Sequence, residues 1–200
     1  MIYIKKYDCV DIPRKGKKKW ETSCGRDLLK FALNNEYRLS LDELSMSIGE
    51  YGKPYFSDRQ DIFFNISHSD GMAAVIIADR SVGIDVQSVR PIKQRMIEMI
   101  CGDREKKFIA ESNDKDECFI KLWSLKESYI KAIGQGMSFS MKKVNFDIGL
   151  LDEITGTGKI SNQSGIYFTK QLDNFMLSAC VLDEETDKQI LEKFFTVNYK

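Results

Sequence analysis

The 200-residue sequence has no apolar run long enough to cross a bilayer and no pair of cysteines at metal-binding spacing. A membrane-spanning helix needs roughly 20 consecutive apolar residues, and the first residues also lack the apolar core of a secretory signal. We therefore expect a cytoplasmic protein with no membrane partner. The cysteines number five and include no CxxC pair, so they favour neither a zinc cage nor a closed disulfide framework.

Net charge is also absent, because 30 basic side chains balance 30 acidic ones. A neutral chain has no general electrostatic attraction to nucleic acid. We therefore expect no nucleic-acid partner, and any recognition of phosphate must be local. Histidine occurs only once, at His68.

The apolar spacing predicts a mixture of helices and strands. Helices are expected over residues 21–36, with Thr22 or Ser23 as the N-cap, over 92–113 with irregular spacing, over 116–133 and over 184–195. Strands are expected at IFFNISHS, MAAVIIAD, VGIDVQ, KVNFDI, GIYFTKQ and NFMLSACVL, and a loop at residues 49–58.

One internal repeat is suggested by the strands. Shifting the chain by about 104 positions aligns the hairpin candidate at residues 62–79 with residues 166–183. The repeat predicts two related α+β halves that meet at a cleft. The alternative is that any two hairpins with similar turns look alike.

The first group of polar residues that could take part in binding or catalysis is Asn65, Ser67, His68 and Ser69. We place them on a turn at the end of a strand. Hydroxyls, backbone amides and the one imidazole suit a phosphate. The alternative is a turn whose side chains bond only their own backbone.

Asp85 stands between Ile84 and Val86 in an expected central strand, so its carboxylate should point to the opposite face from them. If that face lines a cleft, the carboxylate needs a cation or hydrogen-bond donors to offset its desolvation. Metal ligation is one solution, and capping of a turn is the alternative.

Trp123, Glu127 and Lys131 are spaced four residues apart on the strongest expected helix, so they share a face. The glutamate and lysine alone would suit a solvated surface pair. The tryptophan indicates instead that this face is covered, and covered charges need a partner or a role.

A strand acid, a helix acid with a lysine, and a Ser/His segment are what metal-assisted transfer of a phosphoryl-type group requires. Mg²⁺ prefers one or two carboxylates together with substrate phosphate and water. Cations also neutralise the charge that builds on a broken pyrophosphate bridge.

Four segments in this order resemble the 4'-phosphopantetheinyl transferases of the larger, Sfp-like type. Their patterns GKP, FNxSHS, GIDxE and WxxKExxxKxxGxG are similar to GKPYF (52–56), FNISHS (64–69), VGIDVQ (82–87) and WSLKESYIKAIGQGM (123–137). As a set they are far more specific than any one motif. The resemblance covers residues 50–147.

The resemblance implies an α+β fold of two pseudo-twofold-related halves, residues 1–90 and 91–200, with a cofactor cleft between them. It implies transfer of the 4'-phosphopantetheine moiety of coenzyme A to a serine of an acyl or peptidyl carrier protein, giving holo-carrier and adenosine 3',5'-bisphosphate. The implied cofactor is Mg²⁺, and the protein is expected to act as a monomer. The alternative is a catalytically weak module that binds coenzyme A or a carrier protein.

The resemblance also assigns roles to single residues. Glu127, Lys131 and Asp85 are the expected catalytic residues, with Glu127 helping to deprotonate the serine. The expected metal ligands are Asp85, Glu127 and Gln87. The expected contacts to coenzyme A are Arg26, Lys53, Pro54, Ser67, His68, Lys126 and Lys131.

Gln87 is a departure from the family pattern, because many relatives carry a glutamate at this position. An amide oxygen can coordinate a metal but brings no charge, so we expect a lower metal affinity, with Asp85 and Glu127 as the firm pair. For the carrier protein, the expected docking surface is apolar and framed by basic residues within residues 92–104. The alternative for that segment is an ordinary, partly buried helix.

Overall fold

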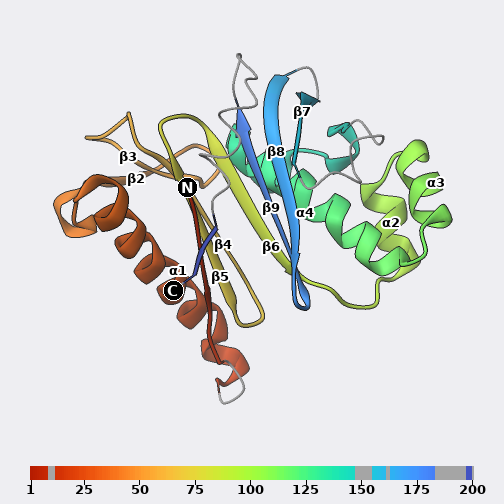
Figure 1. The fold of residues 1–200 in the computed structure, drawn as a ribbon, viewed down its shortest axis with the longest axis horizontal. Helices are drawn as coiled ribbons and strands as arrows, with labels where there is room; N and C mark the ends of the chain where they lie inside the picture. Colours follow the sequence, from red (N-terminus) through yellow and green to blue (C-terminus); the bar gives the residue numbers. More distant parts are fainter. Residues whose placement is uncertain (9–11, 147–154, 161–162, 183–196, 200) are drawn as a thin grey trace.

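The computed structural model describes residues 1–8, 12–146, 155–160, 163–182 and 197–199. Two four-stranded sheets form the centre of the molecule (Figure 1). The first sheet consists, in spatial order, of β10 (Val197–Tyr199), β1 (Ile2–Lys6), β5 (Met72–Ala78) and β4 (Phe63–Ser69). The second consists of β6 (Val82–Ser88), β9 (Phe175–Leu182), β8 (Gln163–Leu172) and β7 (Thr155–Ile160). All neighbours are antiparallel except β1 and β10.

Helices cover the outer faces of both sheets (Figure 1). Helix α1 (Arg14–Tyr37) lies on the first sheet and α4 (Lys115–Ile133) on the second. Beyond α4 lie α2 (Gln94–Ile100) and α3 (Asp103–Glu111), and a two-stranded ribbon pairs β2 (Met46–Ile48) with β3 (Pro54–Phe56). Single 3-10 turns occur at η1 (Leu41–Glu43), η2 (Gly136–Ser138) and η3 (Met141–Lys143). The mixed α+β class expected from the sequence is confirmed.

The hydrophobic core has three parts, because each of the two sheets has apolar side chains on both faces. Successive strand residues point to opposite faces, so Ile76 packs between the two sheets while Ile77 packs under α1. Ile84 and Val86 of β6 also lie between the sheets. The outer face of the second sheet forms a third cluster with α2, α3 and α4. The layers are therefore α1, first sheet, second sheet and α4.

The helix predictions are correct in position, and α4 ends at Ile133 as expected, but the start of α1 differs from the prediction. Helix α1 begins at Arg14, directly after Pro13, and not near residue 21. The N-cap role expected for Thr22 or Ser23 is therefore wrong, and the Thr22 hydroxyl donates to the Lys18 carbonyl inside the helix. The basic run that precedes residue 21 is helical because lysine and arginine have high helix propensity.

Other segments also differ from expectation. The helix expected over 92–113 is divided into α2 and α3 around Cys101 and Gly102, where the Gly102 N–H donates to Glu105 and starts a new helix. Residues 143–146 of the KVNFDI segment form no strand, and the expected loop at 49–58 contains β3. The helix expected at 184–195 lies outside the described residues.

The two segments of the proposed repeat both form hairpins. β4 pairs with β5 and β8 pairs with β9, and each turn has an aspartate with positive φ, 40° at Asp70 and 51° at Asp173. The spacing between these two aspartates differs by one position from the shift that aligns the two segments in sequence. Strand β6 pairs with β9, and β10 pairs with β1. The division into related halves at residue 90 stays a prediction.

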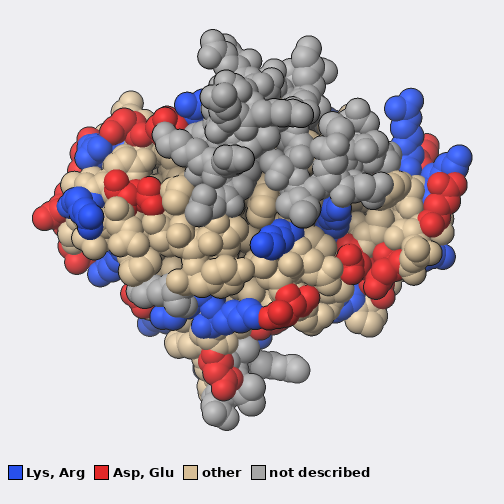
Figure 2. All heavy atoms as spheres, in the orientation of Figure 1, with Lys and Arg blue, Asp and Glu red and all other residues tan. Residues whose placement is uncertain are grey.

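Charged side chains of both signs are interspersed on the face shown in Figure 2. Within the described ranges, none of the helices has the length and apolar character that a membrane span needs.

Helix α4 lies unusually close to β6, and Gly83 is the reason. A Cβ atom on Gly83 would lie 2.0 Å from the Ser128 carbonyl oxygen and 2.5 Å from the Ala132 nitrogen. Both atoms belong to the helix backbone, so they have no rotamer by which to move away. The glycine of VGIDVQ therefore sets the distance between the strand that carries Asp85 and the helix that carries Glu127.

We expect Gly83→Ala to destabilise the protein by about 3 kcal/mol or more, because overpacking against backbone cannot relax through a side chain. Urea unfolding followed by tryptophan fluorescence measures the change. Gly16→Ala is the matched control, since a Cβ there meets nothing within 4 Å. A Gly83→Ala variant as stable as Gly16→Ala would contradict the close approach.

Candidate active site

The outer edge of β6 is the framework of the site. Strand β4 runs beside this edge, and alternate β4 side chains accept hydrogen bonds from the backbone N–H groups of β6. The donors and acceptors are Ile84 N–H to Asn65 Oδ1 (2.9 Å), Val86 N–H to Ser67 Oγ (3.2 Å) and Ser88 N–H to Ser69 Oγ (3.3 Å). We call these three contacts the β4–β6 joint. Side chains therefore connect the two sheets here.

Two lysines bind carbonyl groups of the same strand. Lys53 Nζ donates to the Val82 carbonyl at 2.9 Å, and Lys131 Nζ donates to the Ile84 carbonyl at 3.1 Å. An unpaired buried backbone group is costly. Lys53 and Lys131 thus provide hydrogen-bond donors for the carbonyl groups at the outer edge of β6.

Ser67 and His68 do not lie on a turn, so that prediction is corrected. Both belong to β4, and the turn follows at Asp70 and Gly71. Adjacent strand residues point to opposite faces. Ser67 therefore faces Asp85, whereas His68 faces α1, where its Nδ1 lies 3.5 Å from a carboxylate oxygen of Glu21.

Asp85 is almost fully buried and receives three side-chain donors. Ser67 Oγ (2.9 Å) and Lys131 Nζ (2.5 Å) bind Oδ1, while Gln87 Nε2 (2.9 Å) binds Oδ2. Its apolar strand neighbours point the other way, into the core between the sheets. A buried carboxylate needs such donors to remain charged. The structure thus brings Asp85, Ser67, Gln87 and Lys131 together.

Glu127 belongs to the same cluster, one helical turn before Lys131. Burial raises the pKa of its carboxyl group, and the negative charge of Asp85 raises this pKa further. The positive charge of Lys131 opposes the shift. The indole Nε1 of Trp123 is itself buried, with no hydrogen-bond partner among the described residues. Two carboxyl groups from separate elements therefore share one electrostatic environment.

The donor set fits a magnesium ion. Mg²⁺ is bound by one or two carboxylates, with the remaining positions taken by water and substrate phosphate. Asp85 and Glu127 supply two carboxylates, and the mutual repulsion that raises the pKa of Glu127 is what a shared cation would relieve. In the described part of the chain, no group of three or more His, Cys, Asp or Glu side chains is arranged to hold a metal. Asp85 and Glu127 are the two carboxylates that would hold a cation here.

Lys53 and Pro54 lie beside the end of α4. The Lys53 ammonium also donates to the Ala132 carbonyl at 2.9 Å, and burial lowers its pKa to about 8. Both residues line a cavity of about 270 Å³ with mainly apolar and aromatic walls. Its other lining residues are Tyr55, Phe56, Gln60, Ile62, Phe63 and Phe64.

Neither Arg26 nor Lys126 contacts Asp85 in the described part of the chain. Arg26 is exposed on α1, next to Gly25, which packs on Ile66 of β4, and within the described ranges Arg26 makes no hydrogen bond or ion pair. Its expected contact with coenzyme A stays a prediction.

Lys126 is fully buried, and its ammonium lies 2.7 Å from a carboxylate oxygen of Glu105 in α3. It also donates to the carbonyls of Ile100 and Met141. All three of its N–H donors are therefore used inside the protein. A buried ammonium whose N–H donors are all bonded inside the protein has none left for a soluble ligand, and the expected contact of Lys126 with coenzyme A stays a prediction.

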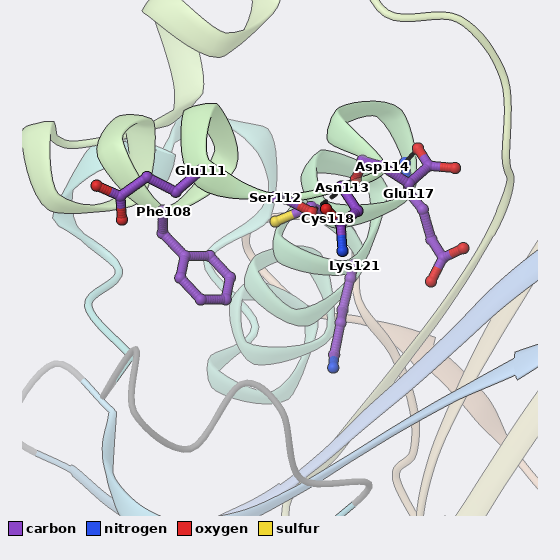
Figure 3. Close-up of a pocket in the computed structure, with 8 residues that line it drawn as sticks. All are labelled: Phe108, Glu111, Ser112, Asn113, Asp114, Glu117, Cys118 and Lys121. Carbon is purple, nitrogen blue, oxygen red and sulfur yellow. Dashed lines mark hydrogen bonds between the residues drawn. The ribbon is translucent and has the colours of Figure 1, made fainter.

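A second cavity, of about 470 Å³, opens between α3 and the first half of α4. Figure 3 shows Phe108 of α3 and Lys121 of α4 pointing toward the same side of it. The lining residues are Phe108, Glu111, Ser112, Asn113, Asp114, Glu117, Cys118 and Lys121, and they include none of the predicted site residues.

Two buried acidic residues that lie against predicted site residues were missed by sequence reasoning. Glu21 is buried beside His68, and Glu105 is the counter-charge of Lys126. Both stand on helices among many other charged residues, so a single sequence carries no signal that separates them from solvated side chains.

The family profile of the 4'-phosphopantetheinyl transferase superfamily matches residues 81–180. These residues include β6, α4 and both acids, and the chain belongs to this superfamily. Within it the chain is similar to the Sfp type. It is 33% identical to 4'-phosphopantetheinyl transferase Sfp of Bacillus subtilis over 123 residues, covering 60% of this chain and 54% of the relative.

A second relative is 4'-phosphopantetheinyl transferase gsp of Aneurinibacillus migulanus, 32% identical over 66% of this chain and 56% of the relative. The chain thus spans about half the length of the curated relatives it matches. Among solved structures, the holo-[acyl-carrier-protein] synthase of Thermotoga maritima matches at 22% identity and a TM-score of 0.39, over 58% of this chain and 74% of that chain.

We expect Lys126→Met to cost about 3–5 kcal/mol of stability, because it leaves the buried Glu105 carboxylate without its counter-charge. Thermal and urea unfolding measure the loss. Lys106→Met is the control, since Lys106 forms solvent-exposed ion pairs with Glu98 and Asp103. If Lys126→Met keeps its stability but loses affinity for coenzyme A, the structural role of Lys126 is wrong.

Proposed function

We propose that this chain transfers the 4'-phosphopantetheine moiety of coenzyme A to a serine of an acyl or peptidyl carrier protein. The observation that carries the proposal is the convergence of a strand acid and a helix acid, Asp85 and Glu127, with Lys131 bonded to Asp85. Membership of the superfamily supports the same reaction class. The products are the holo-carrier and adenosine 3',5'-bisphosphate.

In the proposed reaction, the serine oxygen of the carrier forms a bond to the phosphorus that bears pantetheine. The bond from that phosphorus to the bridging oxygen of the pyrophosphate breaks, and its electrons stay with the departing nucleotide. A serine is a weak nucleophile at neutral pH and needs a positioned base. Glu127, one helical turn before Lys131 and within range of the charge of Asp85, is the proposed acceptor of the serine proton.

Asp85 and Glu127 would hold a magnesium ion, which when bound neutralises charge on the pyrophosphate oxygens. Lys131 supplies a further positive charge at the same place. All three of its N–H donors are bonded to Asp85, Ser67 and the Ile84 carbonyl. A contact to a phosphate would therefore require Lys131 to exchange one of these partners for the ligand.

The nucleotide part of coenzyme A has two proposed contact regions. The cavity beside Lys53 and Pro54 has aromatic and apolar walls that suit a purine ring. His68, on the α1 side of β4, is the proposed contact for the 3'-phosphate. The proposed carrier surface includes α2, where Met99 is 71% exposed.

The decisive experiment mixes the protein with coenzyme A, Mg²⁺ and several unmodified carrier proteins, then measures the carrier mass. With the wild type we expect a phosphopantetheine adduct on the carrier. With Glu127→Gln, which removes both the metal ligand and the base, we expect the rate of transfer to fall by about 100-fold or more. Glu117→Gln, on the same helix but in the 470 Å³ cavity, is the matched control and should keep the wild-type rate. Coenzyme A binding without any adduct would favour the binding module instead.

His68 gives a pH-dependent prediction for binding. Burial lowers the pKa of its imidazole, which favours the neutral ring in the free protein. A phosphate favours the protonated ring, so the affinity contributed by His68 should grow as pH falls from 8 to 6 and should be accompanied by proton uptake.

Calorimetric titration with coenzyme A at several pH values, for the wild type and His68→Gln, isolates this contribution. The phosphate group's own ionisation is common to both proteins. Parallel pH dependences in the two proteins would remove His68 from the phosphate site.

A further inference from the structure

Ser67 has no hydrogen-bonding capacity left for a phosphate. A serine hydroxyl offers one donor and two acceptor positions. The donor binds Asp85 Oδ1 at 2.9 Å, and the acceptors receive the Val86 N–H at 3.2 Å and Lys131 Nζ at 3.1 Å. The residue is only 5% exposed, so there is no water-facing side from which a ligand could approach the hydroxyl.

The three partners of Ser67 are all parts of the proposed catalytic cluster or its strand. One partner is a carboxylate of the acid pair, one is the lysine beside the other acid, and one is the backbone next to Asp85. The hydroxyl therefore fixes the Asp85 carboxylate relative to the lysine of α4. If the FNISHS segment contacts coenzyme A, a group other than the Ser67 hydroxyl makes the contact. His68 points to the opposite face of β4 from Ser67.

We infer that the Ser67 hydroxyl positions Asp85 and Lys131 and does not itself bind coenzyme A. This inference rests on the proposed function for its catalytic consequence. Its structural consequence is independent of turnover, because a misoriented Asp85 binds a divalent cation less well whether or not transfer follows. Partners that orient metal ligands typically change affinity or activity by about 10–100-fold when they are removed.

The test compares Ser67→Ala with Ser69→Ala. Ser69 lies two residues further along β4 and also accepts a β6 N–H, that of Ser88, but has no recorded contact with Asp85. The two variants thus lose the same kind of contact in the β4–β6 joint, and only one loses the donor to Asp85. Ser67→Cys, which keeps the size but has a weak donor, serves if Ser67→Ala fails to fold.

Three quantities are measured on folded protein. The affinity for Mn²⁺ is measured in saturating coenzyme A, by electron paramagnetic resonance of free Mn²⁺. The affinity for coenzyme A is measured without metal, by calorimetry. The third quantity is kcat with a carrier protein. For Ser67→Ala we expect Mn²⁺ affinity and kcat to fall by about 10–100-fold while the metal-free affinity for coenzyme A changes by less than about threefold. Ser69→Ala should leave Mn²⁺ affinity near that of the wild type.

Two results would overturn the inference. One is a loss of metal-free coenzyme A affinity in Ser67→Ala with unchanged Mn²⁺ affinity, which would make Ser67 a phosphate contact. The other is an equal loss of Mn²⁺ affinity in Ser69→Ala, which would mean that only the joint as a whole matters. If the wild type binds Mn²⁺ and coenzyme A but modifies no carrier, the proposed function fails while the Mn²⁺ comparison still decides the role of Ser67. A wild type that binds no Mn²⁺ overturns the inference as well.

Discussion

The outer edge of β6 is the constraint on which the site depends. A strand edge presents N–H and C=O groups that need partners once they are buried. Here the partners are side chains of β4 and two lysines, so the neighbouring strand contributes functional groups where it would otherwise contribute only backbone. The carboxylate of Asp85 lies among these side chains because its own strand is the one they satisfy.

The C-terminal end of α4 extends the same arrangement. Gly134 ends the helix in the left-handed region, at φ 70°, and the Ala132 carbonyl accepts from both Lys53 and Ser81. Positive charge near a helix C-terminus is favourable, because the last carbonyls are unsatisfied and the helix dipole is negative there. The GKPYF segment is therefore held against the helix that carries Glu127. Motifs far apart in sequence come together partly because their side chains provide hydrogen bonds that backbone carbonyl groups need.

Much of the fold and the acid pair could be predicted from local pattern. Alternating and helical periodicities placed β4, β5, β6, β8, β9 and α4, and the face of Asp85 followed from the period of a strand. The extension of α1 to Arg14 was missed because a basic run has no apolar stripe to mark it as helix. The short strands β2 and β3 were missed because a strand of three residues carries almost no periodic signal.

The roles of single motif residues were less predictable than the site itself. Lys126 and Lys131 stand five residues apart on one helix, yet one binds Glu105 in the core and the other binds Asp85. Which lysine faces the site depends on the rotation of α4 against β6, and in the observed rotation the backbone of Ser128 and Ala132 lies against Gly83. Ser67 and His68 are adjacent in sequence, so a motif groups them, but the strand period separates their surroundings.

Gln87 has a role that an ionised glutamate could not perform. Its amide donates to Asp85 Oδ2, whereas a glutamate carboxylate at this position would only accept and would add a third negative charge to the cluster. Without a cation, such a charge would repel Asp85 and would raise the pKa of Glu127 further. With the amide, both oxygens of Asp85 have donors and the acid pair can stay close together before a metal binds. The expected consequence of the smaller negative charge is weaker attraction for a divalent cation, so the orientation of Asp85 has to contribute more to its binding.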